Sequence, residues 1–276
     1  MTPPGLAELL TLPFMQRALL AGLLSGALGG LLGSFAVLRQ LSFFSDALGH
    51  SALLGISLGL LLGLNPTIVL IPFAVLFALV VGQLVERSRL PSDALLNIIY
   101  SSALAIAVVV LSLVPGQRSS IEQLLFGDIL AVGWGDLALI GLLLVVVATY
   151  LVLTRRSQIL LTLDPALATA QGVAVGWQRL LFVVVLAVVV ALSIKAVGVL
   201  LISAFLVIPA CSSRLLSPNF TLYMLLACLL GASCGVLGLL FSGLLNLPSG
   251  PCVVILQLLA FLTALVVSPR RAGALG

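Results

Sequence analysis

Long apolar stretches without interruption recur along this chain of 276 residues, and they constrain its fold more than any other feature. An α-helix needs about 20 apolar residues to cross the hydrocarbon core of a bilayer. The strands of a membrane barrel would instead alternate apolar and polar residues over about ten positions, which these stretches do not do. The pattern therefore predicts membrane-spanning helices, at about residues 15–38, 46–64, 66–85, 94–114, 135–153, 179–195, 196–213, 221–244 and 251–268.

The composition agrees with an all-α integral membrane protein, a polytopic bundle of eight or nine transmembrane helices. Hydrophobic residues make up 62% of the chain and charged residues 7%, whereas soluble domains carry roughly a quarter charged residues. The last four stretches are crowded, and one pair could form a broken or re-entrant helix, which leaves eight spans as the alternative. We expect a single transmembrane domain over residues 1–276 and no secretory signal, because the N-terminus lacks a basic region.

Basic residues are distributed unevenly between the two sets of connecting segments, and this predicts the orientation. With nine spans and an external N-terminus, the inside carries Arg39, Arg87, Arg89, Arg155, Arg156, Arg179, Arg214, Arg270 and Arg271. The outside carries Arg17, Arg118 and Lys195. The positive-inside rule therefore places the C-terminus in the cytoplasm. Because the net charge of +4 is scattered singly or in pairs, it gives no indication of nucleic-acid binding.

The segment SDALGHSALLGISLGLLLG at residues 45–63 places two ionisable side chains in an apolar stretch. Asp46 and His50, the only histidine, are four residues apart and project from the same face of a helix. A carboxylate and an imidazole can bind a divalent metal, and ionisable groups at membrane depth often mark a substrate path. The alternative is structural: Ser45 and Asp46 suit a helix start, and His50 could bond a neighbouring helix.

Small residues recur at every fourth position in the first two stretches. The two sets are Gly22, Gly26, Gly30 and Ser34, and Ser51, Gly55, Gly59 and Gly63. Such stripes let helix backbones approach closely, so we interpret them as packing surfaces. The four cysteines, Cys211, Cys228, Cys234 and Cys252, show no CxxC spacing, and we interpret them as packing residues as well.

Three other segments carry local signals. The outer segment 115–134, with Glu122 and Asp128, mixes apolar and acidic residues, which indicates either an interfacial helix or a contact with an external partner. Pro209 lies inside an apolar stretch, where it predicts a kinked helix. The sequence NLPSGP at residues 246–251 predicts a turn at the outer surface.

The longest cytoplasmic loop, at about residues 155–179, contains a short predicted helix. Asp164 followed by Pro165 is a good helix start, and Gly172 is a natural stop. The helix between them, PALATAQ, has roughly two turns and is too short to be stable alone. It must therefore dock, either against its own protein or against a cytoplasmic partner.

Six sequence segments, in this order along the chain, resemble the membrane permease subunits of ABC importers for zinc and manganese. They are FMQRALLAGLLSGALGGLLGSFAVLR, LSFFSDALGHSALLGISLGLLLGLNP, LLFGDILAV, LDPALATAQGV, KAVGVLLISAFLVIPACSSRLL and LPSGPCVV, within about residues 14–268. The resemblance implies a type II (vitamin B12 importer-like) permease fold in a bacterial plasma (inner) membrane. It also implies a homodimer, a separate cytoplasmic ABC ATPase, and an extracytoplasmic metal-binding protein.

The resemblance also implies roles for particular residues. Asp46 and His50 match the pair that lines the path and contacts the passing metal in this family. The segment similar to the ATPase-coupling helix contributes Asp164, Pro165, Leu167 and Gly172. Asn246 departs from the family pattern, where an Asp often stands, so no metal role is assigned to that turn.

These features predict a transport subunit rather than an enzyme, with no tightly bound cofactor and Zn²⁺ as the transported ion. The chain has no GxxxxGK[ST] motif for ATP hydrolysis, and with one histidine it has no HExxH metalloenzyme motif. One Asp and one His cannot complete a four-ligand zinc site, but two facing pairs in a homodimer, or added water, could. Because carboxylate suits manganese, manganese stays an alternative within the family, and an ion-driven secondary transporter is the alternative outside it.

Overall fold

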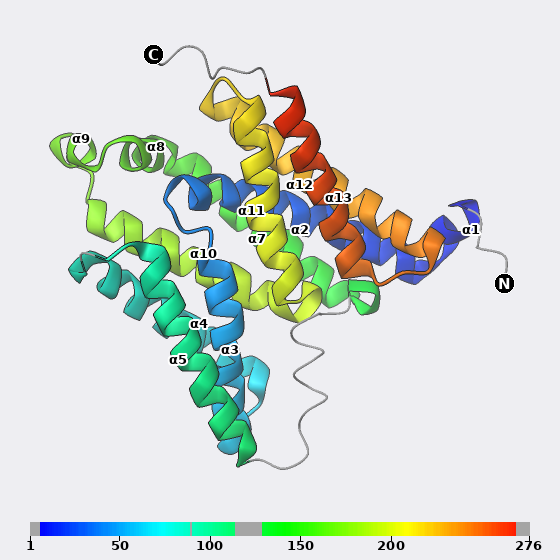
Figure 1. Ribbon diagram of the computed structural model, residues 1–276, viewed down its shortest axis with the longest axis horizontal. Coiled ribbons are helices and arrows are strands. Elements are labelled where there is room, and N and C mark those ends of the chain that lie inside the picture. Colours follow the sequence, from blue (N-terminus) through cyan, green and yellow to red (C-terminus); the bar gives the residue numbers. More distant parts are fainter. Residues whose placement is uncertain (1–5, 89, 114–128, 269–276) are drawn as a thin grey trace. The chain divides into compact units, whose positions relative to one another are not determined.

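The computed structural model describes residues 6–88, 90–113 and 129–268, and over these residues it is all-helical (Figure 1). Nine of the described helices are long and apolar enough to cross a membrane. They are α2 (Pro13–Leu38), α3 (Phe44–Leu61), α4 (Pro66–Arg87), α5 (Ser92–Ser112), α7 (Trp134–Leu153), α10 (Val175–Val197), α11 (Val199–Leu216), α12 (Phe220–Leu245) and α13 (Ser249–Val267). The all-α fold is confirmed, and the larger of the two predicted span numbers fits the described residues.

Shorter elements lie between and before these spans. They are α1 (Leu6–Thr11), the 3-10 turn η1 (Ile129–Ala131), α8 (Arg155–Leu163) and α9 (Pro165–Ala170). Most of the outer segment 115–134 lies outside the described residues, so its two alternatives stay open. The residues of the earlier predictions that fall outside are Arg89, Arg118, Glu122, Asp128, Arg270 and Arg271.

Two of the boundaries between helices in the crowded C-terminal half carry a residue with positive φ. Gly198, with φ of +86°, separates α10 from α11, and Asn246, with φ of +53°, ends α12. Glycine takes this conformation at no steric cost, and asparagine tolerates it better than most residues. The predicted turn is confirmed at residues 246–248, whereas Ser249, Gly250 and Pro251 already lie in α13, and the place of the turn at the outer surface stays a prediction. Pro209 lies within α11 rather than at a break, and the kink predicted there stays a prediction.

The helices form two compact units, which we describe separately. One contains Met1–Val37, Asp128–Leu144 and Leu201–Gly276, and the other contains Leu38–Gly127 and Val145–Leu200. The first unit thus holds α2, α12, α13 and most of α11, and the second holds α3, α4, α5, α8, α9 and α10. The expectation of a single domain over the whole chain stays a prediction.

In the first unit, the small-residue stripe of α2 packs directly against α12. A Cβ atom at Gly26 would overlap the backbone carbonyl of Gly231, and Gly30 is equally close to the α12 backbone. At the end of the stripe, the Tyr223 hydroxyl donates a hydrogen bond to the backbone oxygen of Ser34, at 2.9 Å. Small side chains permit this approach, so the interpretation of the α2 stripe as a packing surface is confirmed.

In the second unit, α3 packs against α4, α5 and α10. A Cβ atom at Gly55 would come within 2.6 Å of Cγ of Phe73, so an α4 ring rests on this glycine. The rings of Phe44 and Phe77 meet edge-on with centroids 5.7 Å apart. Gly63 does not belong to the packing stripe, because it follows the end of α3 with φ of +66° and its Cβ position meets no atom within 4 Å.

Candidate functional site

Asp46 and His50 lie one turn apart near the start of α3, and their side chains lie next to each other. Nδ1 of His50 is 3.6 Å from Oδ1 of Asp46 and 3.0 Å from the backbone oxygen of Asp46. The pair is half-buried, with 27% of the His50 side chain and 35% of the Asp46 side chain exposed. The four-residue spacing therefore places a carboxylate and an imidazole on one helix face, within reach of solvent.

The contact between Nδ1 of His50 and the backbone carbonyl of Asp46 favours the tautomer that carries the hydrogen on Nδ1. A carbonyl oxygen only accepts hydrogen bonds, so Nδ1 must carry the hydrogen and donate it. In the neutral form of a ring with this tautomer, Nε2 keeps its lone pair. Metal-binding imidazoles commonly donate their other N–H to a carbonyl or carboxylate in this manner, which fixes the ring and leaves one nitrogen for the cation.

An aromatic side chain from another helix packs against the imidazole. Tyr100 of α5 meets the His50 ring edge-on, with centroids 5.1 Å apart and an interplanar angle of 79°. Tyr100 also meets Phe43, at 6.1 Å and 88°. Sequence reasoning missed Tyr100, because nothing in the sequence indicates the register between α3 and α5.

The start of α3 differs from the one predicted. The N-cap residue is Phe43, which makes no capping hydrogen bond through its side chain, and the helix begins at Phe44. Ser45 therefore lies in the first turn, where it is 2% exposed, and its predicted role as the cap is wrong. Asp46 does lie in the first turn, where the helix dipole favours a negative charge.

The pair supplies only part of a metal coordination shell. Within the part of the chain that the structure describes, no group of three or more His, Cys, Asp or Glu side chains could hold a metal ion. A closed structural zinc site has four protein ligands. Asp46 and His50 thus form a two-ligand set that water, an anion or a second copy of the chain would have to complete.

The predicted loop helix is present as α9. The Asp164 carboxylate accepts hydrogen bonds from the backbone N–H groups of Ala166, at 2.8 Å, and Leu167, at 3.1 Å. Pro165 occupies the first helical position. Gly172 has φ of +78°, and its N–H donates to the Thr169 carbonyl at 3.0 Å. The predicted start and stop are confirmed, and the helix ends one residue before the predicted Gln171.

A second short helix, α8, precedes α9 and was not predicted. It spans nine residues, and Gln158 and Leu161 are its buried positions. Leu163, the last residue of α8, is 76% exposed, and Leu167 of α9 is 47% exposed, whereas Ala168 of α9 is fully buried. α8 and α9 therefore pack through Gln158, Leu161 and Ala168, and they expose Leu163 and Leu167.

A polar cluster joins α8 to the segment that links α2 and α3. Arg39, the first residue after α2, donates through Nη2 to the side-chain oxygen of Gln158, at 2.5 Å, and to its backbone oxygen, at 3.1 Å. Its Nε donates to the Thr162 hydroxyl at 3.1 Å. Gln158, fully buried, donates through Nε2 to the Tyr150 hydroxyl, at 2.7 Å, and to Oε1 of Gln178, at 3.0 Å.

This cluster fixes the arginine side chain. The guanidinium carbon of Arg39 lies 4.4 Å from the ring centroid of Phe182, a cation–π contact. Burial lowers the pKa of Arg39 to about 10, and the positive charge of Arg179 acts in the same direction. At neutral pH the guanidinium remains protonated. From the sequence we used Arg39 only to predict orientation, because a lone arginine after an apolar stretch gives no sign of its partners.

Comparison with known proteins identifies relatives over nearly the whole chain. The model of the ABC 3 transport family matches residues 11–268. The chain is 33% identical to the high-affinity zinc uptake system membrane protein ZnuB of Haemophilus influenzae, over 90% of this chain and 95% of that protein. It is 28% identical to the manganese transport system membrane protein MntC of Listeria monocytogenes, over 96% and 95%.

A solved structure, PsaBC from Streptococcus pneumoniae in complex with Fab, contains a chain with the same fold. The TM-score is 0.82 at 28% identity, and the match covers 96% of this chain and 95% of that one. The whole-chain matches confirm the membership that the six sequence segments predicted. The chain therefore belongs to the ABC 3 transport family, a family of metal ABC importer permeases.

Proposed function

We propose that this chain is the membrane permease subunit of an ABC importer for a divalent transition metal, with zinc as its substrate. The observation that carries the proposal is the Asp46–His50 pair, in which Nδ1 of His50 lies 3.6 Å from Oδ1 of Asp46 on one face of α3. The similarity to a zinc uptake membrane protein supports the choice of metal. Imidazole nitrogen is also a ligand that suits zinc.

An incomplete ligand set suits transport better than storage. An ion on a transport path must be bound well enough to enter and weakly enough to leave. In the proposed homodimer, two Asp46–His50 pairs face each other across the path, and together they offer four ligands. The ion then passes between two-ligand and four-ligand environments as the pairs approach or separate.

The energy for transport enters through α9. We assign the docking of a separate cytoplasmic ATPase to the segment that contains Asp164, Pro165, Leu167 and Gly172. The cap and the stop hold this six-residue helix in shape, and Leu167 presents exposed apolar surface to the partner. ATP hydrolysis belongs to that ATPase, so the chain itself acts as a transport subunit. An extracytoplasmic binding protein delivers the metal on the other side of the bacterial inner membrane.

Manganese is the second candidate substrate. The similarity to a manganese transport membrane protein covers 96% of the chain, and carboxylate oxygen is a ligand that suits manganese. Both metals therefore have to be compared in one assay.

The test is ATP-dependent uptake of Zn²⁺ and of Mn²⁺ by the reconstituted complex of the chain with its ATPase. We expect His50→Ala and Asp46→Asn to lower zinc uptake by about tenfold or more. Even the loss of a residue that only hydrogen-bonds to a metal ligand lowers metal affinity or activity by about 10–100-fold. Asp93→Asn is the matched control, because Asp93 is an exposed carboxylate in the first turn of α5. Its uptake should equal that of the wild type.

The possible results separate the candidates. Uptake of Mn²⁺ without Zn²⁺, lost in His50→Ala, would assign manganese and keep the mechanism. Uptake that is unchanged in both His50→Ala and Asp46→Asn would reject the proposed path. Uptake that proceeds without ATP or an ATPase subunit would instead indicate an ion-driven secondary transporter.

A further inference from the structure

The face of α3 that carries Asp46 and His50 is the open face in the first half of that helix. Of residues 44–54, all are buried except Asp46, His50 and Leu54, which follow one another at four-residue intervals on one side of the helix. Tyr100 of α5 contacts the His50 ring. The helix that borders this open face is therefore α5.

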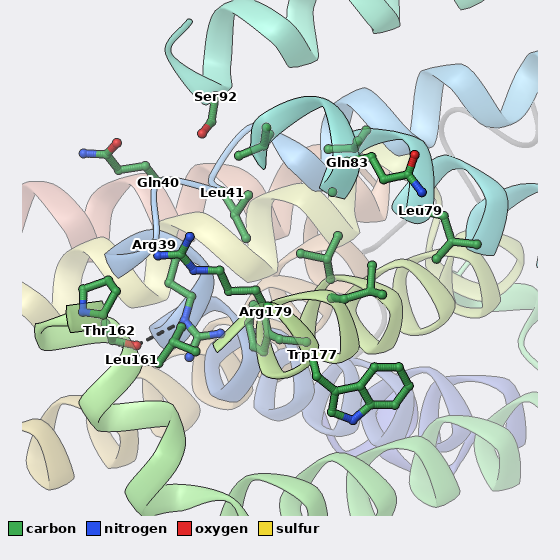
Figure 2. A pocket seen from close by; sticks show the side chains of 18 of the residues that line it. Arg39, Gln40, Leu41, Leu79, Gln83, Ser92, Leu161, Thr162, Trp177 and Arg179 are labelled. Atoms are coloured by element: carbon green, nitrogen blue, oxygen red, sulfur yellow. Dashed lines mark hydrogen bonds between the residues drawn. The ribbon is translucent and has the colours of Figure 1, made fainter. Parts of the chain in front are cut away.

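α3 and α5 pack side by side in the second unit, and they run in the same direction because a single span, α4, separates them in the chain (Figure 1). Their starts lie near one level, since Leu41, which precedes α3, and Ser92, the first residue of α5, line the same cavity of about 610 Å³ (Figure 2). Residues of similar rank in the two helices thus lie at similar depth. Asn97, the sixth residue of α5, falls between Asp46, the third of α3, and His50, the seventh.

Two polar side chains, Asn97 and Ser101, are exposed on α5 on the same side of Tyr100. Asn97 lies about 60° and Ser101 about 100° around the helix from that tyrosine. The Ser101 hydroxyl donates a hydrogen bond to Oδ1 of Asn97 at 3.4 Å. Ser101 is the tenth of the 21 residues of α5, so the polar pair reaches the middle of the span.

Contact of these side chains with lipid would be costly, because hydrocarbon offers no hydrogen-bond partner and polar groups at membrane depth face protein or water. Serine in a helix commonly donates to a backbone carbonyl of the preceding turn, as Ser112 does to Val109 at 2.6 Å. Ser101 donates to a side chain instead, so both polar groups stay on the surface of α5. Asp93, one turn earlier, lies in the first turn, where the headgroup region hydrates a carboxylate without any path.

The opposite side of α5 has a different character. Ile98 and Ser102 each lie two residues from Tyr100, which places them about 160° around the helix from it. Ser102 is exposed between Ile98 and Ile106, which are 57% and 52% exposed. A single hydroxyl among large apolar side chains suits a surface that faces lipid. Ser102 is therefore a matched control for its neighbour Ser101.

We propose, building on the proposed function, that Asn97 and Ser101 line the path of the metal beside the Asp46–His50 pair and hold the water shell of the ion there. In the two-ligand environment, water completes the shell. Water molecules bound to a cation direct their hydrogens outward, so they need acceptors on the wall of the path. The amide oxygen of Asn97 and the Ser101 hydroxyl supply these acceptors. They position the hydrated ion and leave direct binding to Asp46 and His50.

The first test measures whether water reaches this side of α5. Ser101→Cys and Ser102→Cys, each in complex with the ATPase in lipid nanodiscs, are treated with a charged methanethiosulfonate reagent. Only the thiolate reacts, and apolar surroundings raise the pKa of a thiol, so each pKa unit lowers its reaction rate about tenfold. We therefore expect Ser101→Cys to react at least about tenfold faster than Ser102→Cys. Mass spectrometry of the modified peptide separates the new thiol from the native cysteines.

The second test measures ATP-dependent uptake of whichever of Zn²⁺ and Mn²⁺ the wild type transports. We expect Asn97→Leu and Ser101→Ala to lower uptake about two- to tenfold, the effect of a lost hydrogen bond. Ser102→Ala should transport like the wild type. The charged group that the reagent attaches to Ser101→Cys should stop uptake. Copurification with the ATPase identifies any variant that fails to fold.

Two results would overturn the proposal. Equal reaction rates of Ser101→Cys and Ser102→Cys would mean that neither side of α5 faces water at this depth. Fast reaction of Ser101→Cys with unchanged uptake after modification would mean that water reaches Ser101 outside the path. Failure of the proposed function is distinct from both, because uptake would then be unchanged in His50→Ala whatever the reaction rates on α5.

Discussion

Tyr100 is the side chain that most directly restrains the imidazole of His50 from outside its own helix. Edge-on aromatic pairs contribute about 0.5–1.5 kcal/mol beyond the burial of their surface. Tyr100→Ala removes this support, so we expect metal uptake to fall by about two- to tenfold. Tyr100→Phe keeps the ring and should transport like the wild type. Equal losses in both variants would mean that the hydroxyl, and not the ring, is what matters.

The candidate site was predictable only where its contacts are local. Asp46 and His50 lie within one turn, so their spacing alone places them on one face. Tyr100 reaches His50 from α5, and Gln158 reaches Arg39 across more than a hundred residues. Such contacts depend on the register and rotation of separate helices. A single sequence does not contain that information in its periodicity, because apolar membrane helices have little polar contrast between faces.

At the scale of elements, α9 depends on its cap. Asp164→Ala leaves two backbone N–H groups of the first turn without their acceptor, which costs about 1 kcal/mol in a helix with only six residues. We therefore expect weaker copurification of the ATPase with Asp164→Ala. Asp164→Asn, which still accepts these hydrogen bonds, is the matched control. If both variants retain the ATPase equally well, the cap has no part in docking.

The contact between α2 and α12 should tolerate almost no added volume. Gly26→Ala places a methyl group into the α12 backbone at Gly231, and overpacking of this kind typically costs about 1–3 kcal/mol. We expect a lower melting temperature of the purified protein. Gly141→Ala is the control, since its Cβ position meets no atom within 4 Å and alanine favours the helix. A Gly26→Ala variant as stable as Gly141→Ala would contradict the close packing.

Element boundaries were predictable where turn chemistry is strong. The Asp164–Pro165 start, the Gly172 stop and the Asn246 turn all lie where the sequence placed them. α8 was missed because its nine residues are too few to show a period and too polar to suggest a span. Ser45 was wrongly predicted as the N-cap because α3 begins before it, at Phe44, with Phe43 as the N-cap residue. The ring contacts of Phe43 with Tyr100 and of Phe44 with Phe77 stabilise this start more than a side-chain cap at Ser45 would.

At the scale of the molecule, the nine candidate spans among the described residues predict that the two termini lie on opposite sides of the membrane. We expect the N-terminus outside and the C-terminus in the cytoplasm, since basic residues concentrate on the cytoplasmic side. Green fluorescent protein fused to the C-terminus should fluoresce. Alkaline phosphatase fused after Leu247, between α12 and α13, should be active. The opposite pair of results would reverse the topology, and phosphatase activity at both positions would remove one span.

The single histidine makes the candidate site chemically addressable. His50 is half-exposed, its Nδ1 is committed to the Asp46 carbonyl, and Nε2 is the nitrogen left for reaction. A reagent that acylates imidazole therefore has one known imidazole nitrogen to modify in an untagged chain. Protection of that atom by an added cation would report occupancy of the site without flux, vesicles or a substituted residue, and its pH dependence would give the acidity of the ring directly.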